Sequence, residues 1–223
     1  GIDVTGIRSS AFAYNDDIIS VTIPTTLKVI ENSAFYDCDN LNTVTVQNPS
    51  ENISTLEEIG ASAFYSCDSL DKFELGLEPK LKTVGEEAFS STKFTESVSV
   101  GHPFYLGTML IKVSDDESGT FEIPSFVTHI ADYAFSSNGN IKAIAIPSDV
   151  TGIGKYAFSN MCYLREIIYF GTQEEWEAIR FGDGWDNSMG SWVTGGTTTR
   201  FLNGEYDPET ADGYTPGLSF ILN

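Results

Sequence analysis

The chain has few cations, few cysteines and no long apolar run. It carries 12 Lys and Arg against 32 Asp and Glu in 223 residues, a formal net charge of −20 at pH 7. Such a surface repels phosphate backbones and anionic lipid, so we expect no nucleic-acid partner. No stretch of about 18 apolar residues occurs, which predicts no membrane insertion. The acidity fits a surface that keeps the protein soluble, and a specific basic partner is the alternative.

The three cysteines are too few for a disulfide framework. Cys38 and Cys67 each follow a Phe by three residues, and the same place is held elsewhere by Asn15, Thr92, Asn138 and Met161. This mixture of residue types indicates an inward-facing position, where a small polar group can form a hydrogen bond with the backbone of a turn. We therefore interpret both thiols as buried. Cys162 lies one residue out of this register, and a zinc site would need closely spaced ligands.

The chain does have a repeat of about 23 residues. Apolar pairs two residues apart recur along it, at Val21/Ile23, Val44/Val46, Phe73/Leu75, Val98/Val100, Phe121/Ile123, Ile144/Ile146 and Ile167/Tyr169. Their first members are separated by 23, 29, 25, 23, 23 and 23 residues. A fixed period of this length is typical of a solenoid, whose units bury their apolar sides by stacking. Because the apolar positions alternate with polar ones, we expect seven parallel strands in one sheet, about 30 Å long.

Two further ladders complete each unit. Ala-Phe pairs nine residues before the strand cores lie at Ala11-Phe12, Ala34-Phe35, Ala63-Phe64, Ala88-Phe89, Ala134-Phe135 and Ala157-Phe158. They predict a core wedge with Phe35, Phe64 and Phe135 fully buried. Apolar pairs three residues apart predict a short return segment, at Val4/Ile7, Leu27/Ile30, Leu56/Ile59, Leu81/Val84, Val127/Ile130 and Val150/Ile153. Gly60, Gly85 and Gly154 follow this segment, where glycine would permit a tight bend.

The order of these signals carries a family resemblance. Residues 21–41 and 121–135 both read Ile-Pro, then Ile, then Ala-Phe, and the first continues to Cys38 and Leu41. The pattern resembles the BspA-like class of bacterial leucine-rich repeats over roughly residues 4 to 170. The resemblance implies a mostly β, α/β-type fold: a right-handed solenoid of about seven coils with a parallel concave sheet. It also implies an extracellular or cell-surface location and adhesion-like binding, and it supplies no catalytic residues.

Three segments depart from the repeat. An insertion around residues 47–50 predicts a bulge from one coil, and the chain opens in mid-repeat at Val4 without an evident amino-terminal cap or a signal peptide. We expect the native protein to continue upstream or to be capped by a few residues missing here. The fifth coil, residues 107–119, lacks Ala-Phe and predicts a hairpin with an acidic tip at Asp115, Asp116 and Glu117.

The repeat pattern ends at Phe170, which predicts a solenoid over residues 1–170 and a capping segment over 171–223. Thr172 and Glu175 form a capping-box pattern that predicts a short helix through about Ile179, with Trp176 facing the last coil. The rest reads as irregular strands and turns. Residues 195–223 are either an extended arm or a linker toward another domain.

Catalytic and metal-site patterns are sparse. His129 stands where other coils carry Val29, Glu58, Thr83 and Gly152, which predicts an exposed side chain, and His102 has no nucleophile elbow nearby. Phosphate loops, dinucleotide fingerprints and zinc-protease helices are missing, so we expect neither an enzyme nor a cofactor. No metal site is assigned. Calcium stays open for the acidic clusters at 15–17, 115–117, 183–187 and 207–213, although none has the ligand spacing of a calcium loop.

The outward side chains of the expected sheet are mostly Ser, Thr and Ala, so this face is small and neutral on an acidic chain. It predicts a binding surface made by Thr22, Thr43, Thr45, Lys72, Glu74, Ser97, Ser99, Thr120 and Glu122. The partner would be a protein, such as host protein or extracellular matrix. A glycan bound through Trp185 and Trp192 is one alternative, and a structural spacer for other surface domains is another. The oligomeric state stays open.

Overall fold

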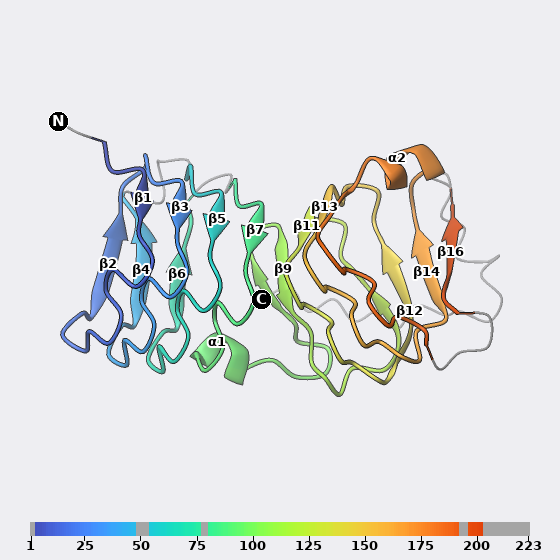
Figure 1. Ribbon diagram of the computed structural model, residues 1–223, viewed down its shortest axis with the longest axis horizontal. Helices are drawn as coiled ribbons and strands as arrows, with labels where there is room; N and C mark the ends of the chain where they lie inside the picture. Colours follow the sequence, from blue (N-terminus) through green and yellow to red (C-terminus); the bar gives the residue numbers. More distant parts are fainter. Residues whose placement is uncertain (1–2, 48–53, 77–79, 192–195, 203–223) are drawn as a thin grey trace.

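The computed structural model describes residues 3–47, 54–76, 80–191 and 196–202. Within these ranges no helix is both long enough and apolar enough to cross a bilayer. The fold is a solenoid of short parallel strands arranged in two blocks along one axis (Figure 1). We call residues 3–91 the N-terminal block and residues 104–202 the C-terminal block.

Each block has a main sheet and a sheet of two- to four-residue return strands. The N-terminal block contains the main strands β2 (Ser20–Ile23), β4 (Thr43–Val46) and β6 (Lys72–Glu74), and the return strands β1 (Gly6–Ile7), β3 (Val29–Ile30), β5 (Glu58–Ile59) and β7 (Thr83–Val84). The C-terminal block contains the main strands β10 (Gly119–Glu122), β12 (Ile141–Ile146), β14 (Glu166–Tyr169) and β16 (Thr198–Phe201). Its return strands are β9 (Met109–Lys112), β11 (His129–Ile130), β13 (Gly152–Ile153) and β15 (Arg180–Phe181), with β8 (Phe104–Leu106) antiparallel to β9.

The strand register follows the repeat inside each block. Val44 pairs with Val21 and with Phe73, and Ile144 pairs with Phe121 and with Ile167, as the spacing predicts. The expectation of one seven-stranded sheet is wrong, because β4 and β10 lie in separate sheets and no strand forms near residue 98.

A single helical turn causes this break. In place of a strand the chain forms α1 (Lys93–Glu96), where the Thr92 amide donates to Thr95 Oγ1 at 3.3 Å. Phe94 then packs edge-on against Phe89 with 6.1 Å between the ring centroids. Val100 is left 54% exposed beside the isolated bridge from Ser99 to His102. The packing of Phe94 on Phe89 thus favours a helical turn here, and the strand that the Val-x-Val pattern predicts at Val98 and Val100 does not form.

The fifth coil forms the expected hairpin with a different tip. Leu106 pairs with Met109, so the tip is Gly107 and Thr108, and Gly107 has a φ of 60°. The placement of the acidic residues at the tip is therefore wrong. Asp115 and Asp116 lie instead in the turn between β9 and β10, which Asn138 fastens by donating from Nδ2 to carbonyl oxygens of Ser114, Asp115 and Glu117 at 3.0, 3.2 and 3.0 Å.

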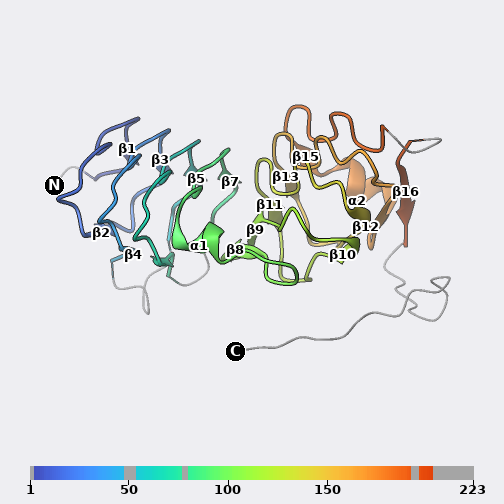
Figure 2. The same cartoon turned by 90° about the horizontal axis from the view of Figure 1, so that it is seen from below.

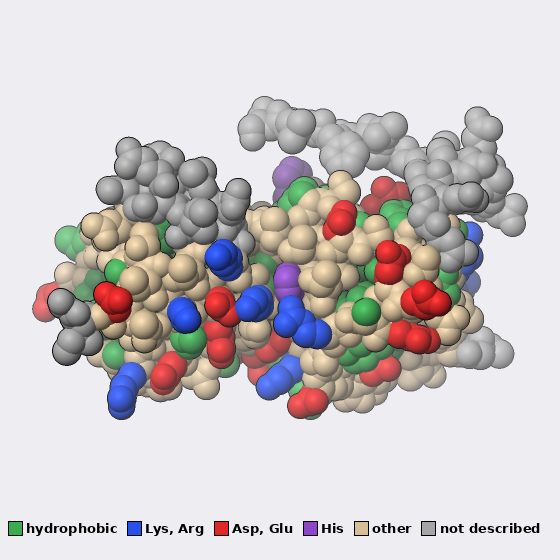
Figure 3. All heavy atoms as spheres, turned by 90° about the horizontal axis from the view of Figure 1, so that it is seen from above, with side chains coloured by type: hydrophobic (Ala, Val, Ile, Leu, Met, Phe, Trp, Pro, Cys, Tyr) green, Lys and Arg blue, Asp and Glu red, His purple; other side chains and the backbone are tan. Residues whose placement is uncertain are grey.

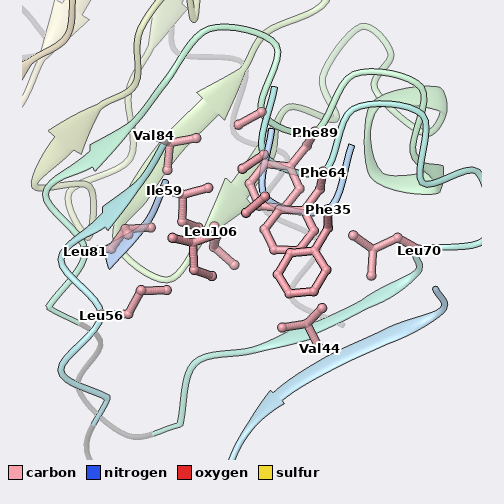
Figure 4. Close-up of a cluster of buried hydrophobic side chains, with 14 of the residues drawn as sticks. Phe35, Val44, Leu56, Ile59, Phe64, Leu70, Leu81, Val84, Phe89 and Leu106 are labelled. Atoms are coloured by element: carbon pink, nitrogen blue, oxygen red, sulfur yellow. The ribbon is translucent and has the colours of Figure 1, made fainter. Parts of the chain in front are cut away.

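The Ala-Phe ladder forms the core of the array, as predicted. The rings of Phe35, Phe64 and Phe89 lie one over another with centroid distances of 5.2 and 5.4 Å (Figure 4). Phe135 continues the pattern in the C-terminal block, 5.2 Å from Phe158. All of these rings are buried, whereas Phe12 in the first coil is 41% exposed because only one of its sides is covered.

The wedge backbone is held between coils by alternate amides. Phe35 N–H donates to the Ala63 carbonyl and Asp37 N–H to the Tyr65 carbonyl, both at 2.8 Å. This alternation requires left-handed residues four positions apart, such as Ser33 with a φ of 56° and Asp37 with 58°. Side chains of Asp and Asn tolerate this conformation better than most. Each coil therefore holds two residues in the unfavourable left-handed conformation, and this aligns its wedge backbone with that of the next coil.

Glycine after the return strand serves close approach and not a bend, which corrects the expectation for Gly60, Gly85 and Gly154. None of the three has a positive φ. A Cβ on Gly154 would lie 2.5 Å from the backbone nitrogen of Asp132 in the preceding coil. A Cβ on Gly85 would lie 2.6 Å from the Ala61 nitrogen. Adjacent coils thus touch backbone to backbone at this point.

Both sheets of the C-terminal block extend beyond Phe170. Strand β15 pairs with β13 and β16 pairs with β14, while Phe158 N–H donates to the Trp185 carbonyl at 2.8 Å. The Trp185 backbone therefore stands where earlier coils carry the wedge Ala, since Phe35 N–H and Phe135 N–H donate to Ala63 and Ala157. The predicted helix is present as α2 (Gln173–Glu177), with both capping-box bonds between Thr172 and Glu175, at 2.8 and 3.1 Å. Trp176 covers Tyr169 at a centroid distance of 5.2 Å.

Replacing Phe64 by Ala should cost about 3–5 kcal/mol of unfolding free energy, because the ring is stacked on both sides. The matched change Phe12→Ala should cost clearly less, since that ring is covered on one side. Urea denaturation followed by circular dichroism measures both values. Equal and small losses would show that the Phe ladder is not the core.

Replacing Gly154 by Ala should destabilise the protein by about 1–3 kcal/mol, because the new methyl group meets backbone atoms that cannot move aside. Gly139→Ala is the control, since its Cβ would have no heavy atom within 4 Å. Thermal denaturation compares the two. An unchanged melting temperature for Gly154→Ala would contradict the close approach of the coils.

Candidate binding surfaces

The outward side chains of the main sheets form what we call the sheet face, which is divided between the two blocks. In the N-terminal block, Thr22 on β2 is aligned with Thr45 on β4 and Glu74 on β6. Lys72 Nζ lies 3.1 Å from Glu74 Oε1, and this exposed pair contributes little to stability. Thr43 is half-buried between its neighbours. This part of the face is thus a strip of hydroxyl groups that ends in an ion pair.

The second part of the sheet face lies in the C-terminal block. Thr120 is aligned with Ala143, and the row continues through Glu166 to Thr198. The row of Glu122 ends at Arg200, whose Nε lies 2.8 Å from Glu166 Oε1. Strand β16 and its charge were missed in the sequence. The run of three β-branched threonines at 197–199, followed by Arg200 and Phe201, was the signal that could have revealed them.

Ser97 and Ser99 do not belong to the sheet face, which corrects their assignment. Ser97 follows α1, and its Oγ donates to the Phe94 carbonyl at 2.7 Å. Ser99 forms the isolated bridge with His102. The nine sequence-predicted residues therefore fall into two groups on separate sheets, with these two serines in the connection between them.

The two blocks meet at an apolar contact, where Leu106, Met109 and Ile111 join the buried core of the N-terminal block. Asp132 N–H donates to the Val84 carbonyl at 3.1 Å, and Ala131 is buried in the core of the N-terminal block. Figure 2 shows α1, β8 and β9 at this junction, between the two stacks of return strands. A cavity of about 540 Å³ adjoins the contact and is lined by residues of both blocks, among them Glu86, Glu87, Phe89, Lys112, Asp116 and Tyr133.

A second cavity at the junction, of about 290 Å³, contains His129 in its wall. The expectation of an exposed His129 is wrong, because its side chain is half-buried and its Nε2 is buried without a hydrogen-bond partner among the described residues. Its Nδ1 lies 3.0 Å from Thr128 Oγ1. Burial lowers the pKa of His129, and the charges of Arg180 and Lys82 lower it further. The imidazole is therefore neutral near pH 7.

Of the two tryptophans in the glycan alternative, the structure describes Trp185, which packs against the last coil. The Trp185 ring is half-buried, with centroid distances of 4.6 Å to Phe181 and 6.0 Å to both Phe158 and Trp176. These contacts show that the Trp185 ring packs against the aromatic side chains of the last coil. Trp192, the other tryptophan of the glycan alternative, lies outside the described residues.

Cys38 and Cys67 take the inward positions that the repeat predicts. Each Sγ donates to the carbonyl of the wedge Phe in the preceding coil, Phe12 and Phe35, at 3.1 Å. Burial raises the pKa of both thiols, and that of Cys67 to about 12. The described ranges hold no group of three or more His, Cys, Asp or Glu side chains placed to bind a metal ion. The acidic cluster at 207–213 lies outside those ranges.

Comparison with known proteins agrees with this architecture. A family model described as the BspA type leucine-rich repeat region matches residues 5–105 and 114–182 in six copies. The chain belongs to this family. The match is interrupted at residues 106–113, which include the last residue of β8, the hairpin tip and all of β9. No curated protein matches the chain.

Several solved bacterial proteins resemble this BspA-type chain. The pneumococcal vaccine antigen PcpA is 22% identical, with a TM-score of 0.32 and coverage of 74% of this chain and 56% of PcpA. The Treponema leucine-rich repeat protein TpLRR, from T. pallidum, is 20% identical, with a TM-score of 0.39 and coverage of 78% and 77%. A leucine-rich repeat protein from Eubacterium ventriosum is 20% identical, with a TM-score of 0.39 and coverage of 89% and 66%. The chain thus spans little more than half the length of PcpA.

Iodoacetamide at pH 8 should label Cys162 well before Cys38 or Cys67 in the folded protein. Cys162 is half-buried, whereas the other two are buried with raised thiol pKa values, so little thiolate is available for alkylation. Mass spectrometry of timed samples measures the order. Equal labelling of all three without denaturant would contradict the inward placement, and urea should equalise the rates.

The same thiol predicts a loss of stability at high pH. The pKa of Cys67 is about 12 in the fold against an ordinary value of 9.0, so its contribution is complete below pH 9 and is lost as the pH rises toward 12. Cys67→Ala removes this titration. Urea midpoints between pH 8 and 11 should therefore fall more steeply for the wild type than for Cys67→Ala.

Proposed function

We propose that the protein is a non-catalytic, extracellular or cell-surface binding module that captures a protein ligand through its sheet face. The observation that carries the proposal is the composition of that face. Two parallel sheets present in-register rows of hydroxyl and Ala side chains, such as Thr22 with Thr45 and Thr120 with Ala143, on a chain of charge −20. Little side-chain bulk opposes an approaching surface there.

The class of ligand and its affinity follow from the net charge of the chain and from the few large anchoring side chains on the sheet face. A net charge of −20 disfavours phosphate-rich partners, which leaves proteins and neutral surfaces. Tight interfaces depend on buried aromatic and Arg side chains. Arg200 is the one such side chain on the described rows, and it is paired with Glu166. We therefore expect modest affinity at each site and firm attachment through many displayed copies.

The location and the non-enzymatic role rest on the family match. The BspA-type repeat supports display outside the cell, and one structural neighbour is titled a leucine-rich cell surface protein from Faecalibacterium prausnitzii. The packing of Trp185 into the last coil speaks against the glycan alternative. A spacer role is the remaining alternative, in which the sheet face binds nothing.

Two double variants test the two halves of the sheet face. Thr22→Glu with Thr45→Glu alters the N-terminal block, and Thr120→Arg with Glu122→Arg alters the C-terminal block. We expect at least one of them to lower capture on immobilised collagen, laminin or fibronectin about tenfold or more, while circular dichroism shows a folded protein.

The matched control is Ser97→Glu with Ser99→Glu, because these serines lie off the sheet face. It should bind like the wild type. Binding that survives both face variants but is lost in Trp185→Ala, with glycan-array signals to match, would favour the tail. Failure of the wild type against all matrix proteins and glycans would leave the spacer role.

A further inference from the structure

We propose that the 290 Å³ cavity at the junction, called here the junction cleft, binds a compact oxyanion: a carboxylate or a sulfate group. Lys155 and Arg180 are its principal ligands, with His129 as an additional donor. This site is separate from the sheet face and does not depend on the proposed function.

The cleft is built by both blocks. Lys82 enters it from the segment before β7, His129 from β11, Lys155 from the residues after β13, and Arg180 from β15. Gly152 on β13 is required for this arrangement, because a Cβ there would lie 2.6 Å from His129 Cδ2. The junction thus brings together cations that are far apart in the sequence.

The charge of the lining is opposite to that of the molecule. Of the charged residues that line the cleft, three are cations and only Asp132 is an anion, whereas acids outnumber bases 32 to 12 in the whole chain. Figure 3 shows Lys and Arg side chains gathered near a histidine in the middle of one face, with acidic side chains beside them. Lys82 and Arg180 both act electrostatically on His129, so both charges lie within electrostatic range of its ring.

Two of these cations have no ionic partner in the part of the chain that the structure describes. Among the described residues, the ion pairs are Lys72–Glu74, Lys82–Glu57, Lys93–Asp71, Lys112–Asp115 and Arg200–Glu166. Lys155 and Arg180 take part in none of them. A guanidinium group presents a planar set of donors that matches the two oxygens of a carboxylate or sulfate.

The acidic group in the cleft is already engaged. Asp132 Oδ1 accepts the Lys155 backbone N–H at 2.7 Å. Burial raises the pKa of Asp132, the Lys155 hydrogen bond and charge lower it, and Glu86 and Glu58 raise it again from the N-terminal block. Asp132 is therefore held by the Lys155 backbone, while the Lys155 and Arg180 side chains supply the positive charge that attracts an incoming anion.

His129 supplies a second sign of a missing acceptor. With Nδ1 facing Thr128 Oγ1, which also lies 2.8 Å from Thr108 Oγ1, the neutral ring can carry its proton on the unpartnered Nε2. A buried donor without an acceptor costs free energy. An oxyanion bound beside the ring supplies that acceptor. The volume, below that of most drug-sized pockets, suits one carboxylate, one sulfate or a single acidic sugar unit.

The test follows the His129 ring C–H resonance while the full chain is titrated with sodium sulfate, sodium glucuronate or a sulfated oligosaccharide. We expect a saturable shift with these probes and none with neutral glucose. Arg180→Gln with Lys155→Gln should weaken binding about tenfold or more, since each charged hydrogen bond is lost. The double variant Arg8→Gln with Arg165→Gln removes the same charge from exposed positions away from the cleft and should bind like the wild type.

The comparison of probes identifies the source of the anion. Tighter binding of the oligosaccharide than of sulfate or glucuronate points to an acidic glycan, and equal binding points to a free small anion. The proposal is overturned if no oxyanion gives a saturable shift, or if the cleft variant and its control bind equally. Because the sheet-face residues are untouched, matrix capture by the cleft variant separates this result from the fate of the proposed function.

Discussion

The structure depends on the fit between coils at the wedge. Stacked Phe rings 5.2 to 5.4 Å apart have nearly the spacing of paired β-strands, so ring stacking and backbone pairing can be satisfied together. The alternate amides of the wedge, such as Phe35 N–H to Ala63 at 2.8 Å, fix the same distance a second time. Glycine at 60, 85 and 154 lets the coils close to that distance after each return strand.

The sequence allowed the repeating part of the fold to be predicted, because each position in a coil meets the same environment in the next. The pairing of Val21, Val44 and Phe73 and the burial of Phe35, Phe64 and Phe135 followed from spacing alone. The break near residue 98 did not follow, because it depends on a contact. Phe94 packs on Phe89 and Phe104, and this tertiary gain outweighs the strand preference of Val98 and Val100.

The candidate sites show the same division. The hydroxyl rows of the sheet face were predicted as far as the strands themselves were, and Ser97 and Ser99 were misplaced together with the missing strand. The junction cleft could not be foreseen. The repeat pattern does not specify the side chains at positions 129, 155 and 180. These residues line one cleft with Lys82 because the two blocks meet at the irregular fifth coil. Strand β16 was hidden because its Thr199 pairs with Ile167, 32 residues earlier, whereas the repeat has a period of about 23 residues.

The hairpin in the fifth coil has a mechanical consequence. Strand β9 pairs with β11, while β7 ends the return sheet of the N-terminal block, so the continuous hydrogen-bond ladder along the solenoid stops between residues 84 and 109. Tension applied along the axis is shared by many parallel backbone bonds inside each block. Across this boundary it falls on the connecting peptide, on the apolar packing of Leu106, Met109 and Ile111, and on single bonds such as that of Asp132 with Val84. A stretched array would yield there first, extending at the joint while the coils on either side keep their shape.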